Sequence, residues 1–101
     1  MSNRENPSGN LGTKMLQETD CVKVWELKLK PGESSEWHSH ENPYIFVVVE
    51  GSKLYAEYAS GDFSETDSLP GDYSINMPST HRVTNTGRTV YRNIIVEIKK
   101  S

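Results

Sequence analysis

The 101-residue chain contains a single cysteine, Cys21. One cysteine cannot close an internal disulfide, so the sequence excludes a disulfide-stapled secreted scaffold. Cys21 is interpreted as a small apolar residue at the start of a strand, with a reactive thiol as the alternative.

Long hydrophobic runs are also missing. No segment approaches the roughly 18 consecutive apolar residues of a membrane-spanning helix. The first residues read MSNRENPSGNLGTKM and lack the apolar region of a secretory signal. These absences predict a soluble cytoplasmic protein with no membrane partner.

The sequence has no excess of positive charge. It contains 11 Lys and Arg residues against 14 Asp and Glu residues, which gives a net charge of -3. Nucleic-acid-binding proteins usually carry a basic face, so no nucleic-acid partner is expected. With 34% hydrophobic residues, the chain has enough apolar surface for one modest core, which predicts a single domain.

No segment has a convincing helical period. Short runs rich in apolar and β-branched residues alternate instead with turn signals such as Pro31-Gly32 and Pro70-Gly71. The pattern predicts an all-β fold, either a sandwich or a barrel. The expected strands are residues 21–30, 35–40, 44–50, 53–59, 73–77, 81–85 and 89–100, with a weaker strand at 63–68.

Residues 1–18 are polar and rich in Gly, Pro, Asn and Ser. They are expected to form a flexible or loosely docked N-terminal arm ahead of one domain at residues 19–101. A short all-β chain must also pair or cover the edges of its sheets. Edge pairing with a second copy is a natural solution, so a homodimer is expected.

All three histidines lie in informative places. His38 and His40 are two residues apart in an expected strand, where side chains at i and i+2 share a face. His81 follows on a different expected strand, which a barrel can bring opposite the pair. Neutral imidazole binds iron, nickel, zinc and copper, and three imidazoles leave open positions for water and substrate. Taken alone, the His-x-His pair could equally be an exposed pair without a ligand.

The residues around this pair resemble the first motif of the cupin family. In that motif five residues separate a Gly from His-x-His, and a Glu and a second Gly follow. Here Gly32 is followed by ESSEW and then by HSH, and the chain reaches Gly51 at the matching distance. The resemblance implies a small, jelly-roll-like antiparallel β-barrel.

The second cupin motif consists of a Gly, a Pro, a His and an Asn. The corresponding residues here are Gly71, Pro78, His81 and Asn85. Two residues separate Pro78 from His81, where the fuller pattern has a longer turn. The resemblance extends over roughly residues 22–99.

The chain departs from the cupin pattern at the position of the Glu ligand, which is Tyr44 here. The resemblance therefore implies a carboxylate-free site, in which one divalent transition metal ion (iron, nickel or zinc) lies on His38, His40 and His81. Carboxylate-free cupins include oxygenases. Because a neutral phenol is a poor ligand, Tyr44 is interpreted as a general acid or base, as a group that orients substrate, or as a packed aromatic residue. Glu41 is a weaker candidate ligand.

The run around the histidine pair also looks like the small cupins associated with β-alanine degradation. These combine a Trp before His-x-His with a Tyr before a valine-rich strand. Here the two features are Trp37 and Pro43-Tyr44. This resemblance indicates a fold and a site rather than a particular reaction.

The sequence favours a metal-dependent enzyme that acts on a small polar metabolite, expected to be a carboxylate or a similar anion. The ion would polarise a carbonyl or carboxylate as a Lewis acid or activate dioxygen, so dioxygenase, lyase and isomerase reactions all stay open. Arg82 and Arg92 could hold the anion, or they are solvated surface groups. The alternatives are a non-catalytic protein that binds a small ligand or metal, and a metal-free structural or interaction barrel.

Other residues are given structural interpretations. Asn85 is expected to satisfy backbone groups in the turn that follows the His81 strand. Glu50, at the far end of its strand, is expected to be solvated. Five aromatic residues are interpreted as core, with the lining of the barrel mouth as the alternative: Trp25, Tyr55, Tyr58, Tyr73 and Tyr91.

Overall fold

The computed structural model describes residues 3–99, except for the side chain of His40. Within this range the chain forms nine strands and no helix, which confirms the expected all-β class. No helix that could cross a membrane is therefore found among these residues. The strands are β1 (Lys14–Glu18), β2 (Val22–Leu29), β3 (His38–His40), β4 (Tyr44–Glu50), β5 (Lys53–Tyr58), β6 (Phe63–Asp67), β7 (Tyr73–Asn76), β8 (Ser79–Asn85) and β9 (Tyr91–Ile98).

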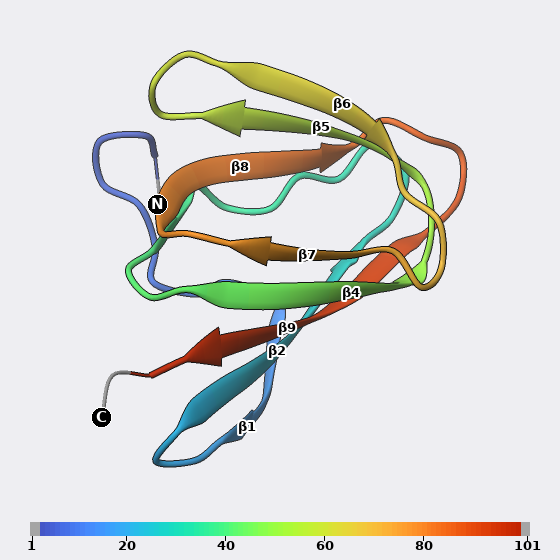
Figure 1. The fold of residues 1–101 in the computed structure, drawn as a ribbon. Helices are drawn as coiled ribbons and strands as arrows, with labels where there is room; N and C mark the ends of the chain where they lie inside the picture. The colour runs from blue at the N-terminus through green and yellow to red at the C-terminus, as the bar shows by residue number, and fades with distance from the viewer. Residues whose placement is uncertain (1–2, 100–101) are drawn as a thin grey trace.

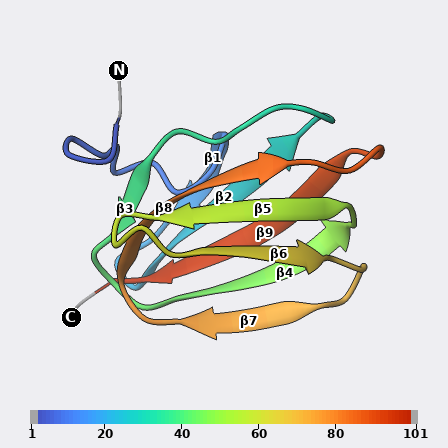
Figure 2. The same ribbon diagram turned by 90° about the horizontal axis from the view of Figure 1, so that it is seen from above.

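The strands form two antiparallel sheets that face each other as two layers (Figure 1, Figure 2). The order is β1-β2-β9-β4-β7 in the five-stranded sheet and β3-β8-β5-β6 in the four-stranded sheet. Strands far apart in the sequence are neighbours, since β2 pairs with β9 over its whole length. The chain thus passes back and forth between the layers, which produces the expected jelly-roll-like barrel.

Alternation of side chains along the strands builds the interior. In β2, the exposed fractions of Trp25, Leu27 and Leu29 are 4%, 4% and 2%, whereas Lys28 between them is exposed. Successive residues of a strand point to opposite faces, so one face of β2 enters the core. The core lies between the two sheets and consists of Leu11, Trp25, Leu27, Leu29, Tyr44, Val48, Tyr91 and Ile95.

The predicted turns and the strand after the histidine pair agree with the structure. Strand β4 begins at Tyr44 and ends at Glu50, as its run of β-branched residues predicts. Gly32 and Gly71 have φ angles of 86° and 91°, which place both in the left-handed region. Glycine adopts such angles without a steric cost, so these two positions can reverse the chain sharply.

The N-terminal segment differs from the expected arm. Residues of β1 pair with β2, and Leu11 is only 1% exposed in the core. The backbone around Ser8 also bonds to β3, since Ser8 N donates to Trp37 O and Ser39 N donates to Ser8 O, at 2.8 and 2.9 Å. The boundary expected at residue 18 therefore does not coincide with a break in the fold. The pattern missed β1 because all five of its side chains are exposed and give no alternating signal.

Candidate functional site

Two of the three histidines meet across the short sheet. His38 on β3 is the register partner of His81 on β8. Their exposed fractions are 2% and 9%, and their rings lie at 74° with centroids 4.5 Å apart. The two Nε2 atoms are 3.1 Å apart. The expectation that the barrel brings His81 to the His-x-His segment is therefore met for His38.

Hydrogen bonds orient both rings. Nδ1 of His38 lies 2.8 Å from the carbonyl oxygen of Glu36. A carbonyl can only accept, so Nδ1 of His38 carries the proton and its Nε2 keeps a lone pair. Nδ1 of His81 lies 3.0 Å from Oγ of Ser79, and this hydroxyl can either donate or accept. The two Nε2 atoms therefore face each other at hydrogen-bond distance.

The surroundings keep these imidazoles neutral. Burial lowers the pKa of His38, partly offset by its hydrogen bond to the Glu36 carbonyl. Burial, with a smaller effect of His38, lowers the pKa of His81 to about 3. Neutral imidazole is the form that binds metal ions. At neutral pH the pair is therefore in the protonation state of a ligand pair.

The distance between the two nitrogens suits a shared ion. Metal–imidazole bonds are about 2.0–2.1 Å long, so nitrogens 3.1 Å apart subtend roughly 100° at an ion. That angle falls between octahedral and tetrahedral values. His40 is two residues from His38 on β3, but its side chain lies outside the described residues. Among the described side chains, no group of three His, Cys, Asp or Glu residues could hold a metal ion. The described pair thus fits a metal, and the third ligand stays a prediction.

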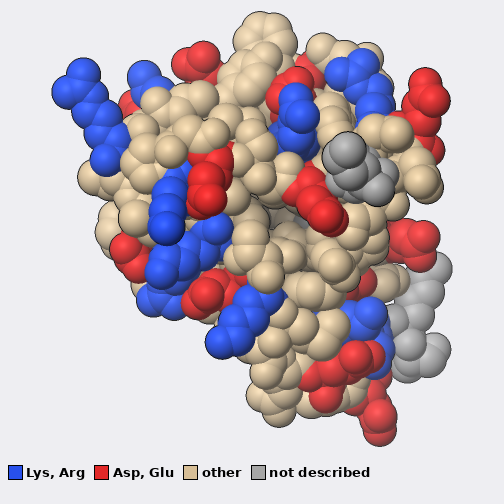
Figure 3. Space-filling model, turned by 180° about the vertical axis from the view of Figure 1, so that it is seen from behind, with Lys and Arg blue, Asp and Glu red and all other residues tan. Residues whose placement is uncertain are grey.

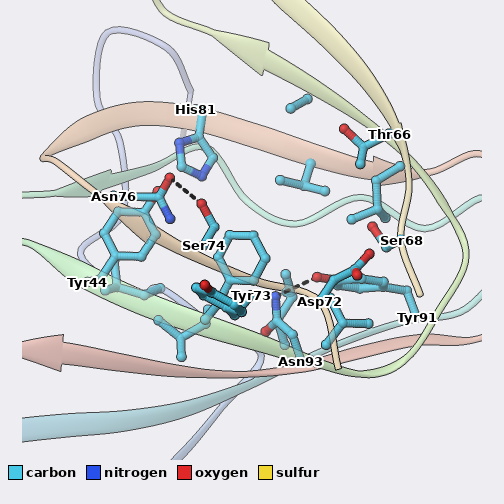
Figure 4. Close-up of a pocket in the computed structure, with 18 of the residues that line it drawn as sticks. Tyr44, Thr66, Ser68, Asp72, Tyr73, Ser74, Asn76, His81, Tyr91 and Asn93 are labelled. Carbon is cyan, nitrogen blue, oxygen red and sulfur yellow. Dashed lines mark hydrogen bonds between the residues drawn. The ribbon is translucent and has the colours of Figure 1, made fainter. Parts of the chain in front are cut away.

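Tyr44 lies at the same end of the interior as His81 (Figure 4). Its side chain is 5% exposed. Burial raises the pKa of Tyr44 to about 12, although a hydrogen bond with Ser79 acts in the opposite direction. The phenol is therefore protonated at neutral pH and can donate a hydrogen bond or a proton. Asn76 is its register partner on β7.

The histidine pair and Tyr44 line a cavity of about 520 Å³ between the two sheets. This volume is in the range of sites that hold small molecules. Figure 4 shows His81, Tyr44 and Asn76 toward one end of the cavity. The cavity is also lined by the apolar residues Leu27, Phe46, Val48, Leu54, Val83 and Ile95. Of these, Phe46 lies between Tyr44 and Val48 along β4, and its register partner on β9 is Ile95.

A buried carboxylate also lies near Tyr44. Glu97 on β9 is the register partner of Tyr44 and is 8% exposed. Its oxygens accept hydrogen bonds from Trp25 Nε1 at 3.4 Å and from Asn42 Nδ2 at 3.1 Å. Glu97 is not among the described residues that line the cavity, so it does not take the place of the missing Glu ligand.

The charged residues considered from the sequence as a metal ligand or as anion-binding groups do not line the cavity. Glu41 is exposed, and it does not line the cavity. Arg82 pairs with Glu57 at 2.8 Å, and Arg92 pairs with Glu26 at 2.9 Å. No Lys or Arg is found among the described residues that line the cavity. Neither arginine is therefore placed to hold an anion in this cavity.

Positive and negative side chains are mixed on the surface. Figure 3 shows basic and acidic side chains interspersed on the face seen from behind. Glu50, expected to be solvated, is 51% exposed and takes part in an ion pair with Arg92 at 3.2 Å. Exposed pairs of this kind contribute little to stability, typically about 0–1 kcal/mol.

The predicted aromatic residues divide between the core and the cavity. Trp25 and Tyr91 are buried, and Tyr91 also lines the cavity. Tyr58 lines it as well, with its ring 5.6 Å from that of His81. Tyr73 also lines the cavity, although it is 71% exposed, whereas Tyr55 stacks on an exposed Phe63. Cys21 is exposed and free, so it is not the apolar strand residue that was expected.

Comparison with solved structures shows that the chain has the cupin fold. A cupin domain protein from Bordetella pertussis Tohama I shares 25% sequence identity and a TM-score of 0.78, over 86% of this chain and 91% of that chain. An RmlC-like cupin from Methanocaldococcus jannaschii has 12% identity and a TM-score of 0.69, over 84% and 76% of the two chains. No family model and no curated protein sequence matches the chain.

An enzyme is also among the structural neighbours. DMSP lyase DddQ from Ruegeria pomeroyi DSS-3 has 13% identity and a TM-score of 0.61, over 81% of this chain and 40% of that chain. At this level of identity the likeness concerns the fold alone, because one fold serves many functions.

Proposed function

We propose that this chain is a metal-binding protein of the cupin fold, in which His38, His40 and His81 hold one divalent transition metal ion, iron, nickel or zinc. We propose further that it is an enzyme acting on a small polar metabolite. The observation that supports the site is the 3.1 Å distance between His38 Nε2 and His81 Nε2, at one end of a 520 Å³ cavity. His40 is assigned as the third ligand because it is two residues from His38 on the same short strand.

The hydrogen bonds to both Nδ1 atoms support this proposal. Metal-binding histidines usually bond through their second nitrogen to a carbonyl, a carboxylate or water, which fixes the ring and the tautomer. Here the carbonyl of Glu36 and the hydroxyl of Ser79 are in those positions. When His81 Nδ1 donates to Ser79, the lone pairs of both Nε2 atoms face each other, and a cation between them would remove the repulsion.

The residues of the chain suggest how a substrate would be bound. A bound ion supplies a Lewis-acid or redox-active centre at this end of the cavity. Tyr44, whose pKa is raised to about 12, stays protonated and would donate a hydrogen bond or a proton to the substrate. Nδ2 of Asn76 is buried and has no hydrogen-bond partner among the described residues, so it could donate to a substrate oxygen. An acid group at this end would meet both donors.

The reaction class stays open between a lyase, an isomerase and a dioxygenase. The fold is compatible with lyase chemistry, since DddQ is a DMSP lyase and shares the cupin fold. A role linked to β-alanine degradation is a narrower proposal, which rests on Trp37 and Pro43-Tyr44. We place the protein in the cytoplasm, with a small-molecule partner and no nucleic-acid or membrane partner.

A non-catalytic protein that binds a small ligand is the second candidate. The observation that favours it is the phenol of Tyr44 at the position of the cupin carboxylate. Turnover separates the two candidates, because a binding protein would take up ligand without converting it.

The test is metal analysis of the purified protein beside activity measured with and without a chelator. We expect about one ion per chain in the wild type, most of it lost in His38→Ala and His81→Ala. Glu41→Gln is the matched control, because Glu41 adjoins the histidine pair in sequence and is exposed. Tyr44→Phe should keep the metal and change turnover or ligand binding. Unchanged metal in both histidine variants would refute the site, and binding without turnover on a panel of small carboxylates and diketones would favour the non-catalytic candidate.

We also propose a homodimer formed along strand β7. This strand is an edge of the larger sheet. Tyr73 and Ile75 on the strand and Met77 directly after it are 71%, 73% and 74% exposed. An exposed apolar edge strand tends to pair with another chain. We expect Ile75→Lys to shift the molar mass measured by light scattering from two chains to one. Met15→Lys, on the opposite edge, should leave a dimer, and a dimer in both variants would exclude the β7 edge.

A further inference from the structure

The end of the cavity away from the histidine pair contains a second group of polar side chains. Figure 4 shows Tyr91, Asn93 and Asp72 there, together with the hydroxyls of Ser68 and Thr66. Asn93 is opposite Val48 in the register of β4 and β9, four residues along β4 from Tyr44. At about 3.3 Å per residue, the two polar ends are roughly 13 Å apart along the strand.

Asn93 has a polar atom that the described structure does not use. Its side chain is 3% exposed, and its Nδ2 donates to the hydroxyl oxygen of Tyr91 at 2.7 Å. Its Oδ1 is buried and has no hydrogen-bond partner among the described residues. A buried oxygen without a partner costs about 1–3 kcal/mol, so in folded proteins such an atom usually has a water, ion or ligand as its partner.

The surroundings of Oδ1 favour a donor rather than an acceptor. Asp72 is the one charged residue among the described residues that line the cavity. Its carboxylate accepts from the backbone N–H of Leu69 through Oδ2 at 2.9 Å, which fixes its position. With Asn93 Oδ1 and the Asp72 carboxylate, this end presents acceptors and negative charge.

We propose that Asn93, Tyr91 and Asp72 form a second subsite that binds the hydrogen-bond-donating end of an elongated ligand, an ammonium or amine. The apolar wall between the two ends holds a short hydrocarbon segment, and the acid end of the same ligand lies at His81, Tyr44 and Asn76. The ligand class is thus a linear ω-amino acid rather than a simple carboxylate. For the acid end this inference rests on the proposed function, whereas the amine end depends on Asn93, Tyr91 and Asp72.

The two ends set an approximate ligand length. Hydrogen bonds of about 3 Å at each end leave roughly 7 Å of the 13 Å for the ligand itself. This length runs from the ligand nitrogen to its carboxylate oxygen, so an extended ω-amino acid of about five to six carbons matches it. A ligand of this kind would use both unpartnered amide atoms, Nδ2 of Asn76 at the acid end and Oδ1 of Asn93 at the amine end.

The experiment compares three probes by calorimetric titration of the purified protein with its native metal content. They are 6-aminohexanoate, hexanoate, which lacks the amine, and hexylamine, which lacks the acid. We expect the wild type to bind 6-aminohexanoate at least tenfold more tightly than hexanoate. Asn93→Leu should abolish this preference and hexylamine binding while it keeps hexanoate binding. Asn93→Asp, which keeps an acceptor and adds charge, should preserve or increase the preference.

The probes separate the failure of this inference from the failure of the proposed function. Equal affinity for the two acids, or a preference unchanged in Asn93→Leu, overturns the second subsite even where metal is bound. So does a preference for adipate, which carries an acid at both ends and would bind if the Asn93 amide faced the other way. Hexylamine binding that is lost in Asn93→Leu, in a protein without metal, would instead support the subsite and refute the metal proposal. If Asn93→Leu does not fold, Tyr91→Phe replaces it. Loss of the preference for 6-aminohexanoate over hexanoate in that variant supports the subsite, and an unchanged preference overturns it.

Discussion

Two buried asparagines on the inner surface of the barrel have opposite hydrogen-bond environments. Asn85, on β8, is 0% exposed and uses its amide completely. Its Oδ1 accepts from Ser52 Oγ at 2.8 Å and from Gly87 N at 2.9 Å. Its Nδ2 donates to Leu29 O at 2.9 Å and to Thr89 O at 2.8 Å. The structure thus confirms the expectation that Asn85 satisfies backbone groups in the turn after its strand.

Asn93 is nearly as buried, but its Oδ1 has no partner among the described residues, and the residue lines a cavity. A fully bonded amide in the interior stabilises one conformation of the chain, because every partner would lose a bond if it moved. A partly bonded amide contributes less to stability and is available to a ligand. By this comparison, Asn85 stabilises the barrel, whereas Asn93 is a residue that a ligand in the cavity would bind.

The largest expected loss of stability follows from replacing Asn85. Asn85→Ala removes four hydrogen bonds, and the two to Ser52 Oγ and Leu29 O are buried, so these partners are left without a replacement. We expect the free energy of unfolding to fall by at least about 3 kcal/mol, measured by urea denaturation with tryptophan fluorescence. Thr86→Ala is the control, since its exposed hydroxyl makes one long bond of 3.4 Å to Lys53 O. An equal loss of unfolding free energy in the two variants would show that the hydrogen bonds of Asn85 do not stabilise the fold.

A smaller effect is expected at the glycine that donates to Asn85. A Cβ at Gly87 would contact Ser52 Oγ and approach the backbone nitrogen of Lys53 to 2.7 Å, so the Asn85 network would have to shift. Gly87→Ala should therefore cost about 1–3 kcal/mol of unfolding free energy. Gly9→Ala is the matched control, because a Cβ there meets no atom within 4 Å. A stable Gly87→Ala variant would mean that the network adapts and does not fix the turn.

Much of the fold could be predicted from the sequence, because apolar runs and turn residues are local signals. The limits of β4 and the turns at Gly32 and Gly71 are of this kind. Strand β1 could not be predicted, since exposed side chains on an edge strand leave no pattern in the sequence. Its position depends on pairing with β2, which the sequence does not encode locally.

The site could be predicted in part. Spacing, together with the resemblance to the cupin motifs, selected His38 and His81, which the structure brings together, whereas the side chain of His40 lies outside the described residues. Ser79 was missed, although it stands two residues before His81 on the same face of β8. Asn93 was missed as well, although its place between buried Tyr91 and Ile95 marks a polar residue on the inner face of β9. No pattern could show which of these buried amides is fully bonded, because the partners of Asn85 come from three different segments of the chain.

The smallest expected change in unfolding free energy is at Asn93. A small change is what we expect of a residue that serves a ligand rather than the fold. Replacing both partners, Asn93→Leu with Tyr91→Phe, removes their mutual bond together with the unpartnered Oδ1 and leaves no buried polar atom behind. Exchanging a hydrogen-bonded pair for apolar groups of similar shape is often nearly neutral, so unfolding free energy should change by less than about 1 kcal/mol. Asn93→Leu alone should cost more than the double variant, because it leaves the Tyr91 hydroxyl without its partner. Were the double variant as unstable as Asn85→Ala, Asn93 would hold the barrel together, and its free oxygen would be no sign of a ligand.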